Sequence, residues 1–294
     1  MNKSRMVVLL IVTMAIWGGT FVVGRVMSQS IEPMALAFWR FVVASVVLFV
    51  LMLRRDGKIA VPQGKAWLWA ASLGLTGVAA YNLFFFAGLK IIPSSRAALL
   101  VALNPIMVAV FGAIFLRQRL SVIRWLGVLL SLFGAVTVIS HAEYSKMLAD
   151  GIGHGEWLIL GCCFSWVAYT LFGKGAVASL GSLPATAWAS VIGCVVLGVV
   201  ATFSGVDLNP IAITPPQWGG IVYLGALATA AGFVWYNNGI RDLGAARTIV
   251  FTNFVPVFAV LSSVLFLGEQ LSWPTIFGGL LVIAGVTLTN VQGR

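Results

Sequence analysis

The sequence predicts an all-α integral membrane protein in which ten transmembrane helices form two inverted five-helix repeats around a central cavity. Three observations support this prediction: the composition, a series of long apolar segments, and an internal repeat. Of the 294 residues, 60% are hydrophobic and 9% are charged, whereas charged residues make up about 25% of a typical soluble protein. So few charges cannot cover a chain with a water-compatible surface, and a membrane protein is predicted.

The apolar segments have the length that a transmembrane helix needs, which is about 20 residues. They are separated by junctions that carry charge, proline or glycine. The ten predicted spans are 6–25, 34–53, 66–89, 95–115, 122–140, 156–177, 184–204, 217–240, 245–267 and 273–291. The first span has no small-x-small cleavage site before its end, so we interpret it as a retained helix and not as a signal peptide.

The net charge of +10 would suggest nucleic acid as a partner if the chain were soluble. Here Lys and Arg lie in the short junctions, where they determine orientation, and no nucleic-acid partner is predicted. The three cysteines, Cys162, Cys163 and Cys194, fall inside predicted spans and are interpreted as small packing residues. No metal site and no cofactor are predicted.

Lys and Arg are distributed unevenly between alternate junctions, and cytoplasmic loops are the ones enriched in them. The richer set comprises Lys3, Arg5, Arg54, Arg55, Lys58, Lys65, Arg117, Arg119, Arg124, Lys174, Arg241, Arg247 and Arg294. The other set contains Arg25, Lys90, Arg96 and Lys146, together with most of the acidic residues. The richer set is therefore predicted to be cytoplasmic, which puts both termini in the cytoplasm.

An internal repeat aligns residues 67–134 with 218–285 in one gapless register, displaced by 151 positions. The identities include Trp67 with Trp218, Arg96 with Arg247, Pro105 with Pro256 and Gly134 with Gly285. Composition bias alone rarely matches Trp, Arg and Pro together, so the repeat is interpreted as real. The predicted organisation is a first repeat at 1–140, an external linker at 141–155 and a second repeat at 156–294.

Each predicted repeat has five spans, so the second repeat enters the membrane with the opposite orientation. An exchange of charge agrees with this inversion. Arg117 and Arg119 follow the fourth span, whereas Gly268 and Glu269 lie at the matching junction after the ninth. The first junction is predicted to face the cytoplasm and the second the outside.

Several short motifs occur along the chain in a fixed order. They are Ile16-Trp17-Gly18-Gly19-Thr20-Phe21, Phe38-Trp39-Arg40-Phe41, Asn104-Pro105, Val255-Pro256 and Gly268-Glu269. With the duplication, this order resembles the EamA-type carriers of the drug/metabolite transporter superfamily, over essentially the whole chain. The second half departs from the pattern at Trp166-Val167-Ala168-Tyr169 and Trp188-Ala189-Ser190.

The resemblance implies a multi-pass protein of the bacterial inner membrane that carries a small organic solute. The family includes bacterial exporters of aromatic and other amino acids. The leading hypothesis is therefore a secondary transporter that exports amino acids by alternating access, with the solute and the lipid bilayer as its partners. The alternative is a transporter of other small amphiphilic metabolites or drugs.

Arg40 is the most informative single charge, because it lies about seven residues into the second span, ~10 Å along the helix. Two interpretations stand. The long side chain reaches back to the membrane surface, or it faces a central cavity and attracts an anionic group such as a substrate carboxylate.

Aromatic and amide side chains within the spans complete the predicted site. The candidate solute-binding residues are Trp17, Phe21, Phe38, Trp39, Arg40, Tyr81, Asn82, Trp166, Tyr169, Trp188, Trp235, Tyr236 and Asn237. The pairs Tyr81-Asn82 and Tyr236-Asn237 each join an aromatic face to an amide, which suits a zwitterion with an apolar side chain. Aromatic residues near span ends also form interfacial belts, and buried amides also tie helices together, so these alternatives stay open.

Pro105 and Pro256 are predicted to kink their helices beside a wet cavity, because each leaves a backbone carbonyl unpaired, that of Val101 or Thr252. A packing kink without a role in movement is the alternative. Small residues in the fifth and tenth spans predict a close helix contact, either between the two repeats or across a homodimer. These residues are Gly127, Ser131, Gly278, Gly279 and Gly285.

Other function classes fit the sequence less well. His141 and His154 lie outside the spans, and there is no zinc-protease motif, nucleophile elbow or P-loop, so neither an enzyme nor an ATP-driven pump is predicted. All eight acidic residues lie in loops or at span ends. This argues against proton antiport without excluding it, and facilitated movement down a solute gradient is at least as well supported. A channel or a scaffold is the remaining alternative.

Overall fold

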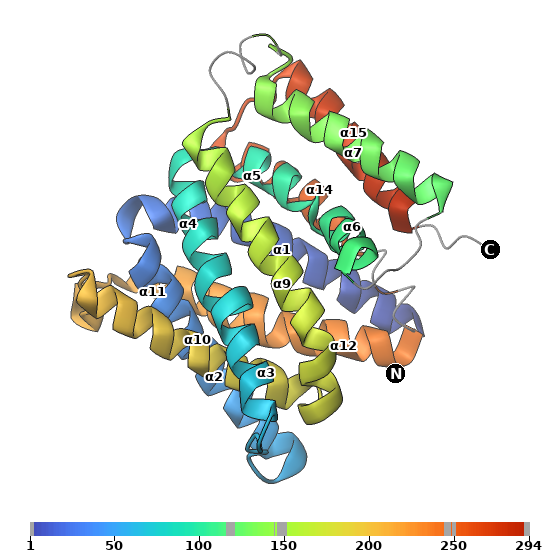
Figure 1. Cartoon of the computed structure of the whole chain (residues 1–294). Coiled ribbons are helices and arrows are strands. Elements are labelled where there is room, and N and C mark those ends of the chain that lie inside the picture. The colour runs from blue at the N-terminus through green and yellow to red at the C-terminus, as the bar shows by residue number, and fades with distance from the viewer. Residues whose placement is uncertain are drawn as a thin grey trace.

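The computed structural model describes residues 3–115, 121–143, 145, 152–243, 248 and 251–290 as one bundle of helices (Figure 1). Within these ranges all regular secondary structure is helical. The predicted junction residues Arg117, Arg119, Arg247 and Arg294 lie outside the described residues, as does much of the predicted linker. The all-α class of the prediction is confirmed.

The first half of the chain folds into helices that match the first five predicted spans. They are α1 (Lys3–Ser30), α2 (Pro33–Asp56), the continuous series α3 (Ala66–Leu73), η1 (Gly74–Ala80) and α4 (Tyr81–Ile91), the interrupted pair α5 (Ser94–Val101) and α6 (Asn104–Phe115), and α7 (Val122–Ser140).

The second half follows the same order. Its helices are α9 (His154–Leu180), α10 (Ser182–Phe203), the short η2 (Pro210–Ala212), the continuous series α11 (Pro215–Val222), η3 (Tyr223–Ala231) and α12 (Gly232–Leu243), then α14 (Phe254–Leu267) and α15 (Trp273–Asn290). Eight helices of the described chain are long and apolar enough to cross a bilayer, and two shorter apolar helices cover Phe254–Leu267 and Trp273–Thr289. The count of ten spans therefore stays a prediction.

Two π-helical segments, η1 and η3, occupy matching positions in the two halves. Gly74–Ala80 corresponds to residues 225–231 when the chain is displaced by 151 positions, and η3 covers all of the latter. A π-helix pairs each N–H with the carbonyl five residues earlier, so its turns are wider than those of an α-helix and often occur at functional sites. Each π-helical segment lies in the middle of a predicted span.

The helix breaks before the two prolines also match. The helix stops at Val101 and resumes at Asn104, just before Pro105, and Phe254 begins α14 two residues before Pro256. The expectation that Pro256 leaves the carbonyl of Thr252 unpaired is wrong, because the N–H of Val255 donates to that carbonyl at 3.1 Å. Proline has no N–H to donate to this carbonyl, and a tighter turn, in which the residue before the proline donates instead, satisfies it.

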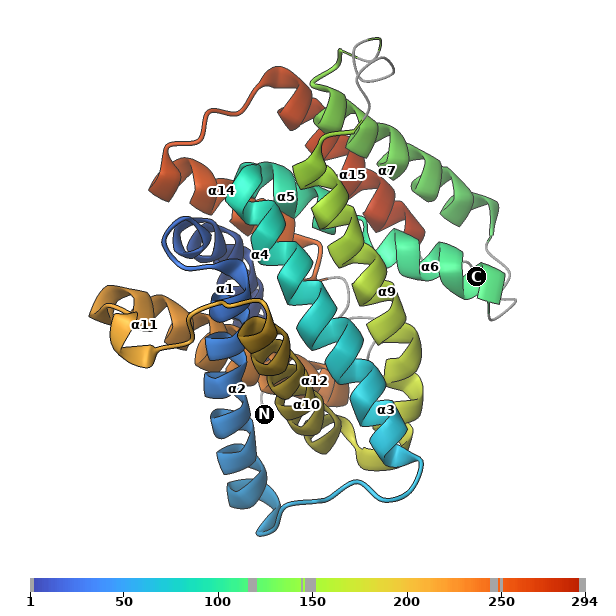
Figure 2. The same cartoon turned by 60° about the vertical axis from the view of Figure 1, so that its left-hand side comes forward.

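The helices α7 and α15 lie side by side in both views (Figures 1 and 2). A Cβ atom on Gly134 would lie 2.6 Å from the carbonyl oxygen of Gly278, and one on Gly278 would lie 2.6 Å from that of Gly134. Gly127 and Gly285 face each other in the same way, at 2.6 and 2.5 Å. The small residues therefore serve a contact within the chain, in which two backbones approach with no room for side chains.

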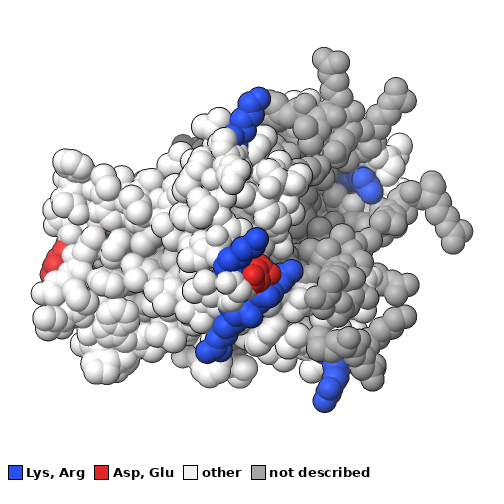
Figure 3. Space-filling model, turned by 90° about the horizontal axis from the view of Figure 1, so that it is seen from below, with Lys and Arg blue, Asp and Glu red and all other residues white. Residues whose placement is uncertain are grey.

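The surface of the bundle carries many exposed large apolar side chains, as lipid contact requires. Examples are Val46, Leu68, Leu129, Leu265 and Leu280. Figure 3 looks at the molecule from below, where described Lys and Arg gather in the middle and on the right, and the left part is uncharged except for one acidic patch at its edge. Charge is thus confined to part of this face.

We expect Gly134→Ala to destabilise the protein, because the new methyl group would also lie 2.8 Å from the backbone nitrogen of Val282. Overpacking of this kind costs about 1–3 kcal/mol, and each kcal/mol lowers Tm by about 2–4 °C in a chain of roughly this size. Thermal unfolding in detergent is the measurement.

Gly173→Ala in α9 is the matched control, since a Cβ there meets nothing within 4 Å. Both changes replace a helical glycine and gain the same helix propensity. Equal Tm values for the two variants would contradict the close α7–α15 contact.

Candidate functional site: a buried arginine held by neutral acceptors

A small cavity of about 60 Å³ lies in the interior of the bundle, next to Arg40. Its walls come from α2, η1, α4, α9, α10, η3 and α12. The polar and aromatic side chains that line it are Arg40, Phe41, Tyr81, Asn82, Trp166, Tyr169, Thr186, Ser190, Thr229 and Phe233. The two halves of the chain therefore contribute to one site.

The Arg40 guanidinium points into the bundle and donates three hydrogen bonds across it. Nη1 donates to Asn82 Oδ1 at 2.9 Å, while Nε and Nη2 donate to Thr229 Oγ1 at 3.2 and 3.1 Å. Among the two interpretations of Arg40, this geometry agrees with a side chain that lines a cavity. Arg40 thereby links α2 to the third predicted span of one half and the eighth predicted span of the other.

The two π-helical segments orient both acceptors. Asn82 donates its amide N–H groups to the carbonyls of Val78, at 2.8 Å, and Gly77, at 3.3 Å, so only Oδ1 is left for Arg40. The Thr229 hydroxyl donates to the carbonyl of Leu224, five residues earlier, at 2.8 Å. Because the Asn82 amide and the Thr229 hydroxyl already donate to backbone carbonyls, each acts as an acceptor toward the guanidinium.

Glycine allows η3 to come close enough for this contact. A Cβ atom on Gly225 would lie 2.5 Å from the carbonyl oxygen of Arg40. With hydrogen in that place, α2 and η3 pack backbone to backbone and Thr229 comes within reach of the guanidinium. Any larger residue at Gly225 would push the two helices apart.

The partners of Arg40 are electrically neutral. Besides Asn82 and Thr229, the guanidinium carbon lies 5.4 Å from the ring centre of Phe41 and 5.8 Å from that of Phe86. In the described part of the chain, no carboxylate pairs with Arg40. A guanidinium in an apolar interior without a counter-ion attracts an anionic group that can enter the cavity.

Aromatic rings form one wall of the cavity. Trp166 lies between Tyr81 and Tyr169, with ring centres 5.5 and 5.2 Å away, and it stacks on Tyr169 at an interplanar angle of 28°. A Cβ atom on Gly77 would collide with the Tyr169 ring, so this glycine makes room for the wall. The cavity thus combines one cation with flat apolar surfaces.

Other predicted site residues lie behind the cavity wall. Trp17 packs on Phe233 and Tyr236, with ring centres 5.8 and 5.4 Å apart, and donates its indole N–H to the carbonyl of Ala228 at 2.9 Å. Phe21 is buried against Phe85 at 5.2 Å. These residues support the lining side chains and do not line the cavity themselves.

The remaining candidates lie farther away. Phe38 and Trp39 form an aromatic cluster with Trp218. Trp188 packs on Phe49 and Trp67 and donates to the carbonyl of Ala60 at 2.8 Å. Trp235 is partly buried and does not line the cavity, and the side chain of Asn237 lies outside the described residues.

Sequence reasoning missed five of the polar and aromatic lining residues, which are Phe41, Thr186, Ser190, Thr229 and Phe233. Thr and Ser inside a helix commonly bond to their own backbone, as Thr186 and Ser190 do, so they give little signal. Phe233 carried a readable signal, because it occupies the position 151 residues after Asn82. The repeat predicts that these two positions correspond.

A larger cavity of about 460 Å³ opens at the end of the bundle where α2 ends, which we call the basic end. Arg54, Arg55 and Asn238 lie at this cavity, and Thr186 and Phe233 line both it and the inner cavity. We call the larger cavity the vestibule. The bundle is therefore open at the basic end, close to the Arg40 site.

At the opposite end of the bundle, Glu269 lies between α14 and α15 and binds the start of α5. One carboxylate oxygen accepts from the backbone N–H and hydroxyl of Ser94 at 2.9 and 2.7 Å, and the other accepts from those of Ser95 at 3.1 and 2.5 Å. Ser94 also bonds to Ser263 Oγ at 2.8 Å. The carboxylate thereby caps α5, whose first N–H groups lack partners in the helix.

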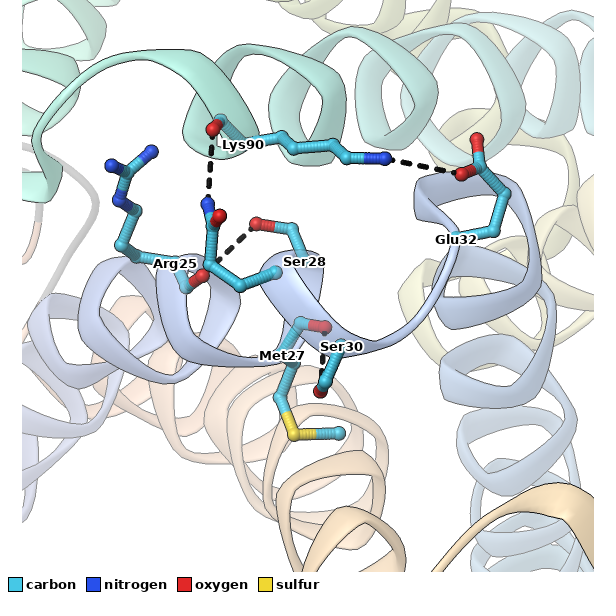
Figure 4. A network of polar contacts seen from close by, with 7 residues as sticks. Arg25, Met27, Ser28, Ser30, Glu32 and Lys90 are labelled. Atoms are coloured by element: carbon cyan, nitrogen blue, oxygen red, sulfur yellow. Dashed lines mark hydrogen bonds and ion pairs between the residues drawn. The ribbon is translucent and has the colours of Figure 1, made fainter.

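Two ion pairs lie at the same end. Arg96 and the buried Glu156 pair at 2.9 Å, and Arg96 also donates to the carbonyl of Ile139. Lys90 on α4 pairs with Glu32 at 3.3 Å, between α1 and α2 (Figure 4). The Lys90–Glu32 pair is exposed, so it contributes less than the buried contacts.

We expect Glu269→Gln to loosen the start of α5, because an amide nitrogen would face donors where an oxygen now accepts. Hydrogen–deuterium exchange of the segment 92–103 should rise by roughly threefold to tenfold. Glu32→Gln is the matched control at the same end and should leave this segment unchanged. Equal exchange in the two variants would contradict the role of Glu269.

The same contact predicts a dependence on pH. Burial raises the pKa of Glu269, but the hydrogen bonds from Ser95 and Ser94 outweigh it and hold the pKa below its usual value. The stability that wild type has over Glu269→Gln is therefore fully present above the ordinary pKa of a glutamate, and is lost as the pH falls through the lowered pKa. Thermal unfolding of both proteins across this pH range measures the difference.

The family comparison matches almost the whole chain. The EamA-like transporter family profile matches residues 4–140 and again residues 153–291. The resemblance inferred from the sequence motifs is thereby confirmed. Both matches cover residues that contribute to the Arg40 cavity.

Several similar proteins have names that describe transporters. The chain is 28% identical to "Uncharacterized transporter YyaM" of Bacillus subtilis, over 92% of this chain and 88% of the relative. It is 28% identical to an "Uncharacterized transporter" of Archaeoglobus fulgidus, over 99% of both chains. It is also 28% identical to a "Probable terminal-alkyne amino-acid exporter" of Streptantibioticus cattleyicolor, over 99% of this chain and 95% of the relative.

A solved structure shares the fold. A chain described as "Crystal structure of protein" superposes with a TM-score of 0.68 at 18% identity, and the match covers 98% of each chain. At this identity the similarity concerns the fold alone.

Proposed function

The chain belongs to the EamA-like transporter family, and from this premise we propose that it is a secondary transporter of small organic metabolites, foremost amino acids. Transport proceeds by alternating access across the bacterial inner membrane. The relative named as an amino-acid exporter favours this solute class over other small amphiphiles or drugs. Those other amphiphiles are the second candidate.

The observation that carries the proposal is the neutral surroundings of Arg40. Asn82 and Thr229 accept three hydrogen bonds from the guanidinium and leave its charge uncompensated. A solute carboxylate entering the cavity supplies the missing charge, and the rings of Tyr81 and Trp166 supply apolar contact for a side chain. A carboxylate next to an apolar group is the chemistry of an aromatic or aliphatic amino acid.

The proposed architecture is that of two inverted five-helix repeats with ten spans, 1–140 and 156–294, joined by an external linker. Three features support it: the two family matches, the π-helical segments at matching positions, and the reciprocal contact of α7 with α15. The contact of Gly134 with Gly278 becomes that of Gly285 with Gly127 when each residue is exchanged for its counterpart. A two-fold axis between antiparallel helices produces this pattern.

Alternating access follows from the two ends of the bundle. The basic end, which the excess of Arg and Lys assigns to the cytoplasm together with both termini, has an open vestibule. The opposite end is held shut by Glu269 on the serines of α5. A protein in this conformation loads its solute from the cytoplasm, which is the direction of export.

Counterflow in liposomes tests the proposal. Purified protein is reconstituted into vesicles loaded with an unlabelled amino acid, and uptake of the same labelled amino acid is followed for a panel of aromatic, aliphatic and charged species. Uptake of at least one panel member above protein-free vesicles is expected. A parallel run with an imposed pH gradient distinguishes facilitated movement from proton antiport.

Arg40→Gln is expected to raise the KM for the transported amino acid roughly tenfold or more, because a charge-assisted hydrogen bond to the carboxylate is lost. Arg40→Lys should lie between wild type and Arg40→Gln, since it keeps the charge but not the planar fork. Lys90→Gln, which removes an exposed charge outside the cavity, serves as the control. An unchanged KM in Arg40→Gln would remove Arg40 from the binding site.

A further inference from the structure

The vestibule at the basic end is lined by apolar side chains and by two arginines that take no part in the Arg40 site. Its apolar wall consists of Leu48 and Leu51 from α2, Leu183 from α10 and Val234 from α12, and Arg54 and Arg55 lie along its rim. At about 460 Å³ it falls within the range of cavities that hold small ligands, roughly 300–1,000 Å³. It combines a pair of cations with an apolar surface.

The two rim arginines have charge available for a ligand. Arg54 pairs with no carboxylate of the described chain, and Arg55 contacts Asp56 at 3.5 Å with both side chains exposed. An exposed pair of this kind contributes little free energy, so Arg55 is not held by it. Both guanidinium groups are free to meet an anion at the mouth of the vestibule.

The vestibule adjoins the Arg40 cavity. Thr186 and Phe233 line both spaces, so they form the partition between them. Phe233 packs against Trp17, with ring centres 5.8 Å apart, and this contact holds Phe233 in its place in the partition in the present conformation. A solute that travels from the basic end to Arg40 must pass this threonine and this phenylalanine.

The volumes of the two cavities indicate in which order a solute occupies them. The inner cavity of about 60 Å³ is well below the roughly 300–1,000 Å³ of cavities that hold small ligands. The vestibule is large enough without rearrangement. In this conformation a solute therefore binds first in the vestibule, and it reaches Arg40 only when Phe233 moves.

We infer that the vestibule is a second binding site, in which Arg54 and Arg55 hold the solute carboxylate and the leucine-rich wall holds its apolar part. Phe233 separates this loading site from Arg40. The inference rests on the proposed function and extends it to a specific solute class, amphiphilic carboxylates, and to a specific order of binding.

Initial rates in sided membrane vesicles test the inference. The probe is the amino acid that wild type transports best in counterflow, compared with its amide derivative, which lacks the carboxylate. In Arg54→Gln/Arg55→Gln, the KM for entry at the basic end is expected to rise about fivefold with the maximal rate unchanged. The KM for entry at the opposite end should stay at the wild-type value while the maximal rate in that direction falls about fivefold, because the solute leaves through the vestibule and a carrier that equilibrates its solute has one ratio of maximal rate to KM in both directions. All rates for the amide should stay unchanged.

Salt and a matched variant sharpen the test. The Debye length falls from about 8 Å at 0.15 M salt to about 3 Å at 1 M, so the difference between this double variant and wild type should shrink at high salt. Lys58→Gln/Lys65→Gln removes the same charge from the same junction but outside the vestibule. Its KM should equal that of wild type, and a reporter fused to the C-terminus checks that orientation is kept in both.

Three outcomes would overturn the inference. An unchanged KM in Arg54→Gln/Arg55→Gln, with Arg40→Gln still impaired, removes the vestibule site and leaves the proposed function intact. A KM shift that appears only when the vesicles contain phosphatidylglycerol, and not in pure phosphatidylcholine, assigns the arginine pair to lipid headgroups. Wild-type protein that transports no member of the panel overturns the proposed function and this inference together.

Discussion

A guanidinium in the interior of an apolar bundle has to find its hydrogen-bond acceptors within the protein, because lipid offers none. Much of the central architecture follows from meeting this requirement at Arg40. The acceptors come from Asn82 in one half and Thr229 in the other, so both halves must approach α2 at the same level. The glycine at position 225 permits that approach, and the π-helical turns supply the carbonyls that orient the acceptors.

The two ends of the bundle are built from different chemistry. The end opposite the vestibule relies on directional contacts: a carboxylate that caps a helix and a buried ion pair. The partition between the vestibule and Arg40 consists of Thr186 and of Phe233, which packs on the ring of Trp17. Under the proposed alternating access, one end would open by breaking hydrogen bonds and the other by repacking side chains.

The sequence was sufficient to predict the helical membrane class and the family, because these depend on composition and short motifs. It left open whether the Arg40 side chain faces a cavity or reaches the membrane surface. Asn82 lines the cavity and accepts from Arg40, and its contact with solute stays a prediction. Trp17 was expected to line the cavity, but it packs behind Phe233, which does line it. The reason is that periodicity identifies the face of a helix but not its depth or rotation relative to the neighbouring helices. Thr229 was missed because its position as an acceptor for Arg40 depends on a π-helical turn, and no local sequence pattern predicts such a turn.

The neutral acceptors around Arg40 also have an electrical consequence. A fixed arginine contributes no moving charge, so the charge carried across the membrane in each cycle is that of the solute and any coupled ion. A zwitterion that pairs its carboxylate with Arg40 and moves alone transfers no net charge. Membrane voltage, which exerts about 2.3 kcal/mol per elementary charge at 100 mV, then neither drives nor opposes the cycle, and the solute stops accumulating when its concentrations on the two sides are equal.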